Sequence, residues 1–332
     1  MHAIYRYGPN GSDEIRLKIV GGLKAVLFSA ILLWAPPLLA DFPEKSVEYV
    51  IPFGAGGESG VTALLQKPVF RKLTGHDLVI KYRPGGGGAV AWGQLNEMLD
   101  DGHTIIGVNL PHILLQPLRG ANYRTEDLAI VHIFHYTPHA LLVRKESQYQ
   151  KLADLIDIMN AKPSKVAFGG SGRGTANQLA QVWFDERLLT KSGYNGYKGT
   201  AAAVAALLDE RVDASWAYTT AAVKYRKNLR ILAFAMEKRH EKFPNVPTFR
   251  ELGFDFVGGA YRGIAVPKST PLETQKKISD TFERLALEPE YVARKRELGF
   301  VPLSVGVGQI STFMKSRRVE YLPLAREAGL IN

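Results

Sequence analysis

Four glycine-rich turns, each between a strand-like run and a helix-like run, constrain this chain more than any other feature. They occupy residues 54–60, 83–88, 169–175 and 197–200. Such a turn directs the free N–H groups of the helix start at whatever lies above it, and the positive end of the helix dipole adds to the effect. Four of these junctions predict a pocket, built from loops and helix ends, that holds an anion such as a carboxylate.

Beyond residue 40, short β-type runs alternate with helical runs, which predicts an α/β fold with a largely parallel sheet in each of two lobes. The expected strands are 47–53, 78–82, 104–109, 130–134, 140–144, 166–168, 214–218, 231–235 and 263–267. The expected helices are 61–73, 89–99, 152–161, 175–188, 201–210, 251–252, 271–287, 290–298 and 307–328.

No low-complexity linker separates the lobes, so strands or short loops near Ala140–Arg144 and Gly263–Pro267 are expected to connect them. Lobe 1 then consists of residues 41–140 and 265–332, and lobe 2 of residues 141–264. A ligand cleft between the lobes follows, with the glycine turns on its walls.

Composition excludes several classes of site. The chain of 332 residues has no cysteine, which excludes disulfides, thiol catalysis and cysteine–zinc sites. The net charge is +10; residues 1–40 hold four basic and two acidic side chains, so the remainder carries +8. The basic residues are scattered and no basic run is interleaved with aromatics, so an anionic small ligand is favoured over nucleic acid.

The N-terminal 40 residues have the pattern of a secretory signal. Lys18 and Lys24 precede the apolar run Ala25–Ala35, and the segment Pro36–Ala40 provides a site for cleavage after Ala40. The apolar run is short for a transmembrane helix, although a retained membrane anchor is the alternative. We therefore expect residues 1–40 to be a signal peptide and the mature protein to be periplasmic.

Several segments resemble, in order and spacing, the substrate-binding proteins of tripartite tricarboxylate transporters, the Bug or TctC family. The matching segments are Phe42–Lys45, Pro52–Gly57, Arg83–Gly88, Ser171–Thr175, Tyr197–Thr200, Glu237–Arg239, Pro244–Phe249 and Gly263–Pro267. The resemblance covers residues 41–332. It implies a type II periplasmic-binding-protein fold, in which two lobes close over a carboxylate ligand and the loaded protein docks on a membrane permease.

By this resemblance, loops 53–60 and 85–89 would hold one carboxylate through backbone N–H groups and waters. Loops 170–175 and 197–200 would close from the second lobe. A strand end and two tyrosines add further candidates for ligand contact. The expected ligand-binding residues are Phe53, Gly54, Ala55, Gly57, Glu58, Ser59, Gly86, Gly87, Ala89, Asn109, His112, Ser171, Gly172, Thr175, Tyr197, Gly199, Thr200, Tyr218 and Tyr261.

This chain departs from the family pattern at two acidic positions. Gly60 stands where the first loop usually ends in Asp, and Ala217–Tyr218 replaces an Asp-Asn pair of the second lobe. The loss of two acids predicts a pocket that is more positive or more apolar. It favours plain carboxylates over ligands that donate hydrogen bonds to an aspartate.

Other readings of these residues stay open at the level of sequence. The glycine turns could be tight turns with nothing bound. Arg262 could be a carboxylate-binding fork or half of a structural ion pair. Ser171 lies in a partial nucleophile elbow, but Arg173 occupies the place of the second glycine. The histidines lack the spacing of a metalloprotease site.

Together these observations predict an exported, monomeric solute-binding protein without catalytic activity, cofactor or metal. It would capture an organic carboxylate of the di- or tricarboxylate class and deliver it to a tripartite-type permease. A ligand sensor that presents its closed form to a membrane signalling partner is the alternative, and a hydrolase on the same scaffold is a more distant one. Citrate, other di- or tricarboxylates and aromatic carboxylates all fit the same loops.

Overall fold

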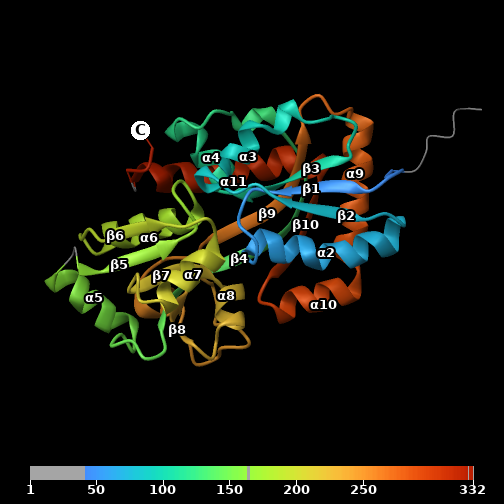
Figure 1. The fold of residues 1–332 in the computed structure, drawn as a ribbon. Coiled ribbons are helices and arrows are strands. Elements are labelled where there is room, and N and C mark those ends of the chain that lie inside the picture. Colours follow the sequence, from blue (N-terminus) through green and yellow to red (C-terminus); the bar gives the residue numbers. More distant parts are fainter. Residues whose placement is uncertain (1–41, 163–164, 328, 332) are drawn as a thin grey trace, which may run out of the picture. The chain divides into compact units, whose positions relative to one another are not determined.

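The computed structural model describes residues 42–162, 165–327 and 329–331 (Figure 1). The expected signal peptide, residues 1–40, lies outside the described residues. The strands are β1 (Val47–Ile51), β2 (Leu78–Tyr82), β3 (Thr104–Leu110), β4 (Leu128–Arg144), β5 (Ala167–Gly170), β6 (Gly193–Gly196), β7 (Ala214–Tyr218), β8 (Leu229–Phe234), β9 (Gly259–Pro267) and β10 (Val301–Gly306).

Helices connect most of these strands. The α-helices are α2 (Glu58–Thr74), α3 (Ala89–Gly93), α4 (His112–Leu115), α5 (Leu152–Ala161), α6 (Ala176–Arg187), α7 (Thr200–Leu208), α8 (Thr219–Lys224), α9 (Leu272–Leu287), α10 (Pro289–Glu297) and α11 (Val307–Glu327). Short 3₁₀ helices are η2 (Gly86–Gly88), η3 (Leu95–Glu97), η4 (Pro117–Arg119), η5 (Thr125–Asp127) and η7 (Arg250–Leu252). Among the described residues, none of the helices has the length and apolar character needed to cross a membrane.

The sheet is mixed, with the order β2-β1-β3-β9-β4-β7-β5-β6, and β10 and β8 also pair with β4. Parallel pairs lie toward the two ends, β1 with β2 and β3, and β5 with β6 and β7. All pairs made by β4 and β9 are antiparallel. The α/β prediction is confirmed, but the sheet is less parallel than expected, because the chain leaves the first half on β4 and returns on β9 in the opposite direction.

Strand β4 is the structural link between the two halves of the sheet (Figure 1). Its residues 128–138 pair with β9, and its residues 139–144 pair with β7 and β8. The sequence pattern predicted two separate strands here. Pro138 lies where β4 changes partner, opposite Gly259, the first residue of β9. A residue without an N–H is tolerated at such a strand terminus.

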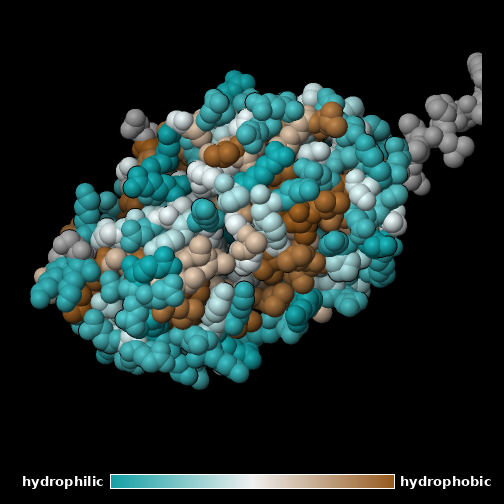
Figure 2. Space-filling model, viewed as in Figure 1, coloured by the Kyte–Doolittle hydropathy of each residue, from teal (hydrophilic) through white to brown (hydrophobic). Residues whose placement is uncertain are grey.

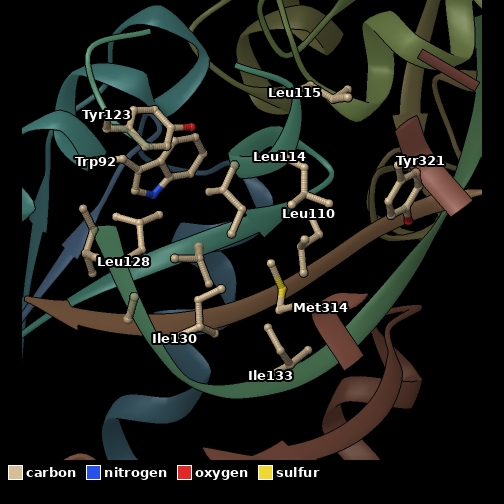
Figure 3. Packing of buried hydrophobic residues seen from close by; sticks show 14 of the residues in the cluster. Trp92, Leu110, Leu114, Leu115, Tyr123, Leu128, Ile130, Ile133, Met314 and Tyr321 are labelled. Atoms are coloured by element: carbon tan, nitrogen blue, oxygen red, sulfur yellow. The ribbon is translucent and has the colours of Figure 1, made fainter. Parts of the chain in front are cut away.

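Separate apolar clusters support the two halves. In the first half, Trp92 packs edge-on against Tyr123, and its indole N–H donates to the Gly107 carbonyl at 2.8 Å (Figure 3). In the second half, Trp216 stacks on Phe249 inside another buried cluster. Because each half buries its own core, the loops at the junction between the halves are not needed for core packing and are available to form a binding site.

Candidate functional site

Two helices that start at the junction have no side-chain cap. Helix α2 is capped by Gly57 and α7 by Gly199, and neither helix start receives a side-chain hydrogen bond. The first N–H groups of a helix have no partner within the helix and bind anions readily. Helix α6 differs, because the Thr175 hydroxyl accepts from the Gln178 N–H and caps it. Of these three helices, α2 and α7 therefore keep uncapped starts that can receive an anion.

The four predicted loops meet in two pairs. The Gly54 N–H donates to the Lys198 carbonyl at 3.0 Å, which joins the first loop to the fourth. The second loop approaches the third so closely that a Cβ on Gly87 would lie 2.6 Å from the Arg173 carbonyl oxygen. Segments far apart in the sequence thus lie side by side within each pair, and their joint role in holding an anion stays a prediction.

A small polar cavity lies where the first, third and fourth of these loops meet. Both uncapped helix starts contribute to its wall. It is lined by Phe53, Gly57, Glu58, Ser59, Asn109, His112, Ser171, Gly199, Thr200 and Arg262. Nine of these ten residues were expected at the ligand, and Arg262 is the addition. Contact with a ligand stays a prediction for all of them.

Glu58 and Arg262 form a buried ion pair in this cavity. An Arg262 Nη2 donates to Glu58 Oε2 at 2.6 Å, and both side chains are 4% exposed. The hydroxyl of Thr220 on α8 also donates to Glu58. Burial raises the pKa of Glu58 above its usual range, and the Arg262 guanidinium opposes that rise. Since β9 and α2 position the two groups, the fold holds this pair in place independently of any ligand.

The guanidinium of Arg262 keeps one nitrogen without a partner. Its carbon lies 4.8 Å from the centre of the Tyr218 ring, and its Nη1 is buried with no hydrogen bond. The Tyr218 hydroxyl is buried beside it; burial raises the pKa of Tyr218, and the nearby Arg262 and Ser171 side chains oppose that rise. A buried donor without a partner is costly, so Nη1 of Arg262 is available to a ligand group.

Strand register places Asn109 beside this arginine. Asn109 on β3 pairs with Arg262 on β9. With the amide oxygen of Asn109 facing both neighbours, it accepts from Arg262 Nε at 3.0 Å and from Ser59 Oγ at 3.3 Å, while its nitrogen donates to Val108. This network fixes the guanidinium plane and leaves only its far side free.

His112 supplies a neutral ring to the cavity wall. It lies edge-on to Phe53 and Trp92, with ring centres 5.7 and 6.5 Å away. Burial, with a contribution from Arg262, lowers the pKa of His112 well below its usual range. Its Nδ1 is buried without a partner. The imidazole is therefore a neutral hydrogen-bonding group, not a source of positive charge.

Ten of the expected residues do not line this cavity. They are Gly54, Ala55, Gly86, Gly87, Ala89, Gly172, Thr175, Tyr197, Tyr218 and Tyr261. The glycines among them shape the contacts between loops. Ala89 and Tyr197 pack on apolar clusters, and the Tyr261 hydroxyl accepts from Arg317 at 2.8 Å. Tyr218 lies against Arg262 and can act through it.

The two family acids are absent from the wall of this cavity. A side chain at Gly60 would meet the Tyr82 ring at 3.0 Å, and Ala217 is fully buried in an apolar cluster. The cavity contains Glu58, an acid that was expected there, two residues before Gly60 on the same helix. Because Glu58 offers acceptors to a hydrogen-bond donor, it bears on the expected preference for plain carboxylates, which stays a prediction.

A second, larger cavity of about 140 Å³ adjoins the first and shares Glu58 and Thr200 with it. Its wall is mainly apolar. It is lined by Gly56, Glu58, Val61, Thr200, Ala201, Val204, Thr220, Ala221, Lys224, Tyr225, Leu298 and Phe300. Figure 2 shows apolar surface over α2, one of the elements around it. Sequence reasoning missed this part of the cleft because Leu298 and Phe300 are distant in the chain.

The remaining chemical candidates have structural partners. The Ser171 hydroxyl donates to the Asn177 side-chain oxygen, and His139 approaches Asn177 at 3.5 Å instead of the serine. Burial lowers the pKa of His132 to about 4 and of His139 to about 3. Within the described ranges, no group of three or more His, Cys, Asp or Glu residues is arranged to hold a metal ion.

The sequence model of the tripartite tricarboxylate transporter family receptor, TctC, matches residues 63–330. The chain belongs to this family. Protein BugT of Bordetella pertussis is 26% identical over 315 residues, which cover 91% of this chain and 95% of BugT. The resemblance seen in the sequence motifs is thereby confirmed.

Solved structures support the fold assignment. The periplasmic binding protein BugD superposes with a TM-score of 0.82 at 23% identity, covering 87% of this chain and 99% of BugD. Rpa4515 of R. palustris with adipate superposes with a TM-score of 0.82 at 23% identity, covering 87% of this chain and 99% of Rpa4515. MatC of Rhodopseudomonas palustris with bound malate superposes with a TM-score of 0.77 at 23% identity, covering 88% of this chain and 100% of MatC. The fold is that of periplasmic binding proteins of the TctC/Bug type, a family of solute-binding proteins.

Proposed function

We propose that this protein is an exported solute-binding protein that captures an organic carboxylate of the di- or tricarboxylate class and delivers it to a tripartite tricarboxylate-type membrane permease. One observation carries the proposal most directly. Two uncapped helix starts and the unpaired Nη1 of Arg262 belong to one buried cavity. Backbone N–H groups and a guanidinium are the donors that offset the desolvation of a carboxylate.

The ligands of similar proteins support the carboxylate class. Adipate and malate, named with two of the similar structures, are both dicarboxylates. The family description as a transporter receptor supports a permease as the partner. Export through residues 1–40, which rests on the sequence pattern alone, and a monomeric state complete the proposal.

The two halves of the sheet serve in this proposal as lobes that close over the ligand. We place lobe 1 at residues 41–140 and 265–332 and lobe 2 at residues 141–264, joined through β4 and β9. Ligand binding favours closure when the ligand contacts both walls at once. The contacts Gly54–Lys198 and Glu58–Thr220 connect the two walls.

A thermal-shift panel tests the proposal. The purified protein is heated with mono-, di- and tricarboxylates, including adipate, malate and citrate. A ligand that binds the folded state increases the free energy of unfolding by about 2.7 kcal/mol at 100 times Kd, and the melting temperature rises with it. A folded protein whose melting temperature responds to no carboxylate would contradict the proposal.

Gly57→Val provides the matched variant. A Cβ at Gly57 would lie 3.2 Å from the Gly54 carbonyl oxygen and 4.0 Å from the Thr200 N–H, so a branched side chain blocks access to the α2 start. The backbone of Gly57 is extended, which valine adopts without strain. We expect the unliganded melting temperature to change little and the ligand-induced shift to shrink. An unchanged ligand shift would contradict the role of this loop.

A further inference from the structure

We propose that Glu58 and Arg262 make the cleft selective for carboxylates that carry a hydroxyl or ammonium group on the carbon next to the carboxylate. The inference rests on the proposed function, because it specifies the chemistry of the ligand at the same site. The ligand carboxylate pairs with Arg262, and the neighbouring hydroxyl or ammonium group donates to Glu58.

The two side chains belong to the cleft and not to an apolar core. Both line the polar cavity, and Glu58 also lines the adjoining apolar cavity. Glu58 therefore lies at the junction of the two spaces. A ligand that occupies both spaces must pass this carboxylate, and the group it presents there is the one that Glu58 selects.

Both partners keep hydrogen-bonding capacity that the protein does not use. Nη1 of Arg262 is buried without a partner, with the Tyr218 ring beside its guanidinium. A carboxylate has about four acceptor positions; the bonds from Arg262 and Thr220 occupy one on each oxygen of Glu58, and the nearby Thr137 hydroxyl, which helps to lower the Glu58 pKa, leaves at least one position for a ligand. The site thus offers donors on one side and acceptors on the other, at neighbouring positions.

The charge of the pair favours the same ligand. Glu58 offsets the charge of Arg262, so the two side chains bring no net charge to the cavity. A plain carboxylate adds a negative charge near Glu58 in a space where water screens little. A hydroxyl group reduces that repulsion by donating to Glu58, and an ammonium group replaces it with attraction.

Matched ligands that differ at one carbon test the selectivity on the wild-type protein. One series is succinate, malate and aspartate; the other is 3-phenylpropanoate, 3-phenyllactate and phenylalanine, whose apolar body suits the second cavity. Titration calorimetry gives Kd for each ligand. In the series that binds, we expect the hydroxyl or ammonium member to bind about tenfold or more tightly than its plain analogue, because the analogue leaves buried groups unpaired.

Glu58→Gln separates this role from a structural one. The variant keeps the shape of the side chain and removes its negative charge. We expect the plain carboxylate to bind more tightly than in wild type and the ammonium ligand less tightly. Opposite changes for two ligands cannot come from a loss of stability, which weakens both.

The outcomes separate this inference from the proposed function. A wild-type protein that prefers the plain analogues still captures carboxylates, and only the selectivity inference is overturned. An unchanged preference in Glu58→Gln overturns it as well. If neither series binds and the thermal-shift panel is flat, the proposed function fails and this inference fails with it.

Discussion

Burial changes the protonation of single charged residues in this fold, and Lys295, which lies outside the cleft, is an example. This residue of α10 is 1% exposed, and its ammonium donates to the Phe134 carbonyl and lies 4.9 Å from the centre of the Tyr291 ring. His132 and His135 of β4 face the same charge, which contributes to lowering the pKa of each ring. Burial lowers the pKa of Lys295 from 10.5 to about 7.

Lys295→Met removes a pH-dependent cost. The unfolded chain holds the lysine proton up to about pH 10.4, whereas the folded chain releases it near pH 7, so the lysine costs stability increasingly as pH falls through this window. As pH rises from 7 to 10, the free energy of unfolding of wild type should therefore increase relative to that of the variant, by about 1.4 kcal/mol per pH unit. Denaturant titrations across this range measure the difference.

Lys67→Met serves as the control, because Lys67 is exposed on α2. The free energy of unfolding of Lys67→Met should differ from that of wild type by the same amount at every pH, within experimental error. A difference between wild type and Lys295→Met that stays constant from pH 7 to 10 would show that the buried ammonium titrates normally in the folded protein.

Residues of the cleft differ in how far the sequence reveals them. Glu58, Ser59 and Thr200 follow glycine turns and could be predicted from that pattern. Arg262 stands alone as a charge within an apolar strand, which signals either a ligand fork or an ion pair. The sequence could not decide, because its partner Glu58 is 204 positions away. Thr220 gave no signal, since a hydroxyl at a helix start is ordinary.

Elements were predictable where local pattern and tertiary context agree. β6 reads Gly-Tyr-Asn-Gly and β10 contains Pro302, so neither has the β-branched pattern of a strand, and both form because a neighbouring strand is available. The predicted helix 89–99 is interrupted instead. Gly93 ends α3, where a Cβ would lie 3.1 Å from the Asn122 carbonyl oxygen.

Contact between the second and third glycine loops can be tested with two glycines of similar backbone. Gly87 has φ +66° and would place a Cβ 2.6 Å from the Arg173 oxygen, while Gly120 has φ +83° with open space around it. Alanine at either site costs about 1 kcal/mol of stability through its positive φ, and at Gly87 the clash with the Arg173 oxygen adds to that cost. We expect Gly87→Ala to weaken carboxylate binding by about tenfold, or 1.4 kcal/mol.

Gly120→Ala should lower the free energy of unfolding, measured by denaturant titration. It should leave the Kd for the carboxylate, measured by calorimetry, unchanged. If both variants bind like wild type, the approach of these loops does not contribute to the closed site.

At the scale of the whole molecule, the fold class and the family could be predicted from the order of motifs along the chain. The path of β4 through both halves could not, because Pro138 interrupts its pattern locally. What the complete fold adds is convergence: α2 and α7 start at one cavity, and β3 and β9 deliver Asn109 and Arg262 to it. Our central claim is that this convergence captures a carboxylate.

The most direct test is the Kd of the best carboxylate from the panel for wild type and for the double variant Glu58→Gln/Arg262→Gln. The double variant removes both charges together, so neither is left buried without its partner. We predict saturable binding of one ligand per wild-type protein and a Kd about 100-fold higher in the double variant, or about 2.7 kcal/mol. Equal affinity in a folded double variant would contradict the claim that this cavity binds the ligand.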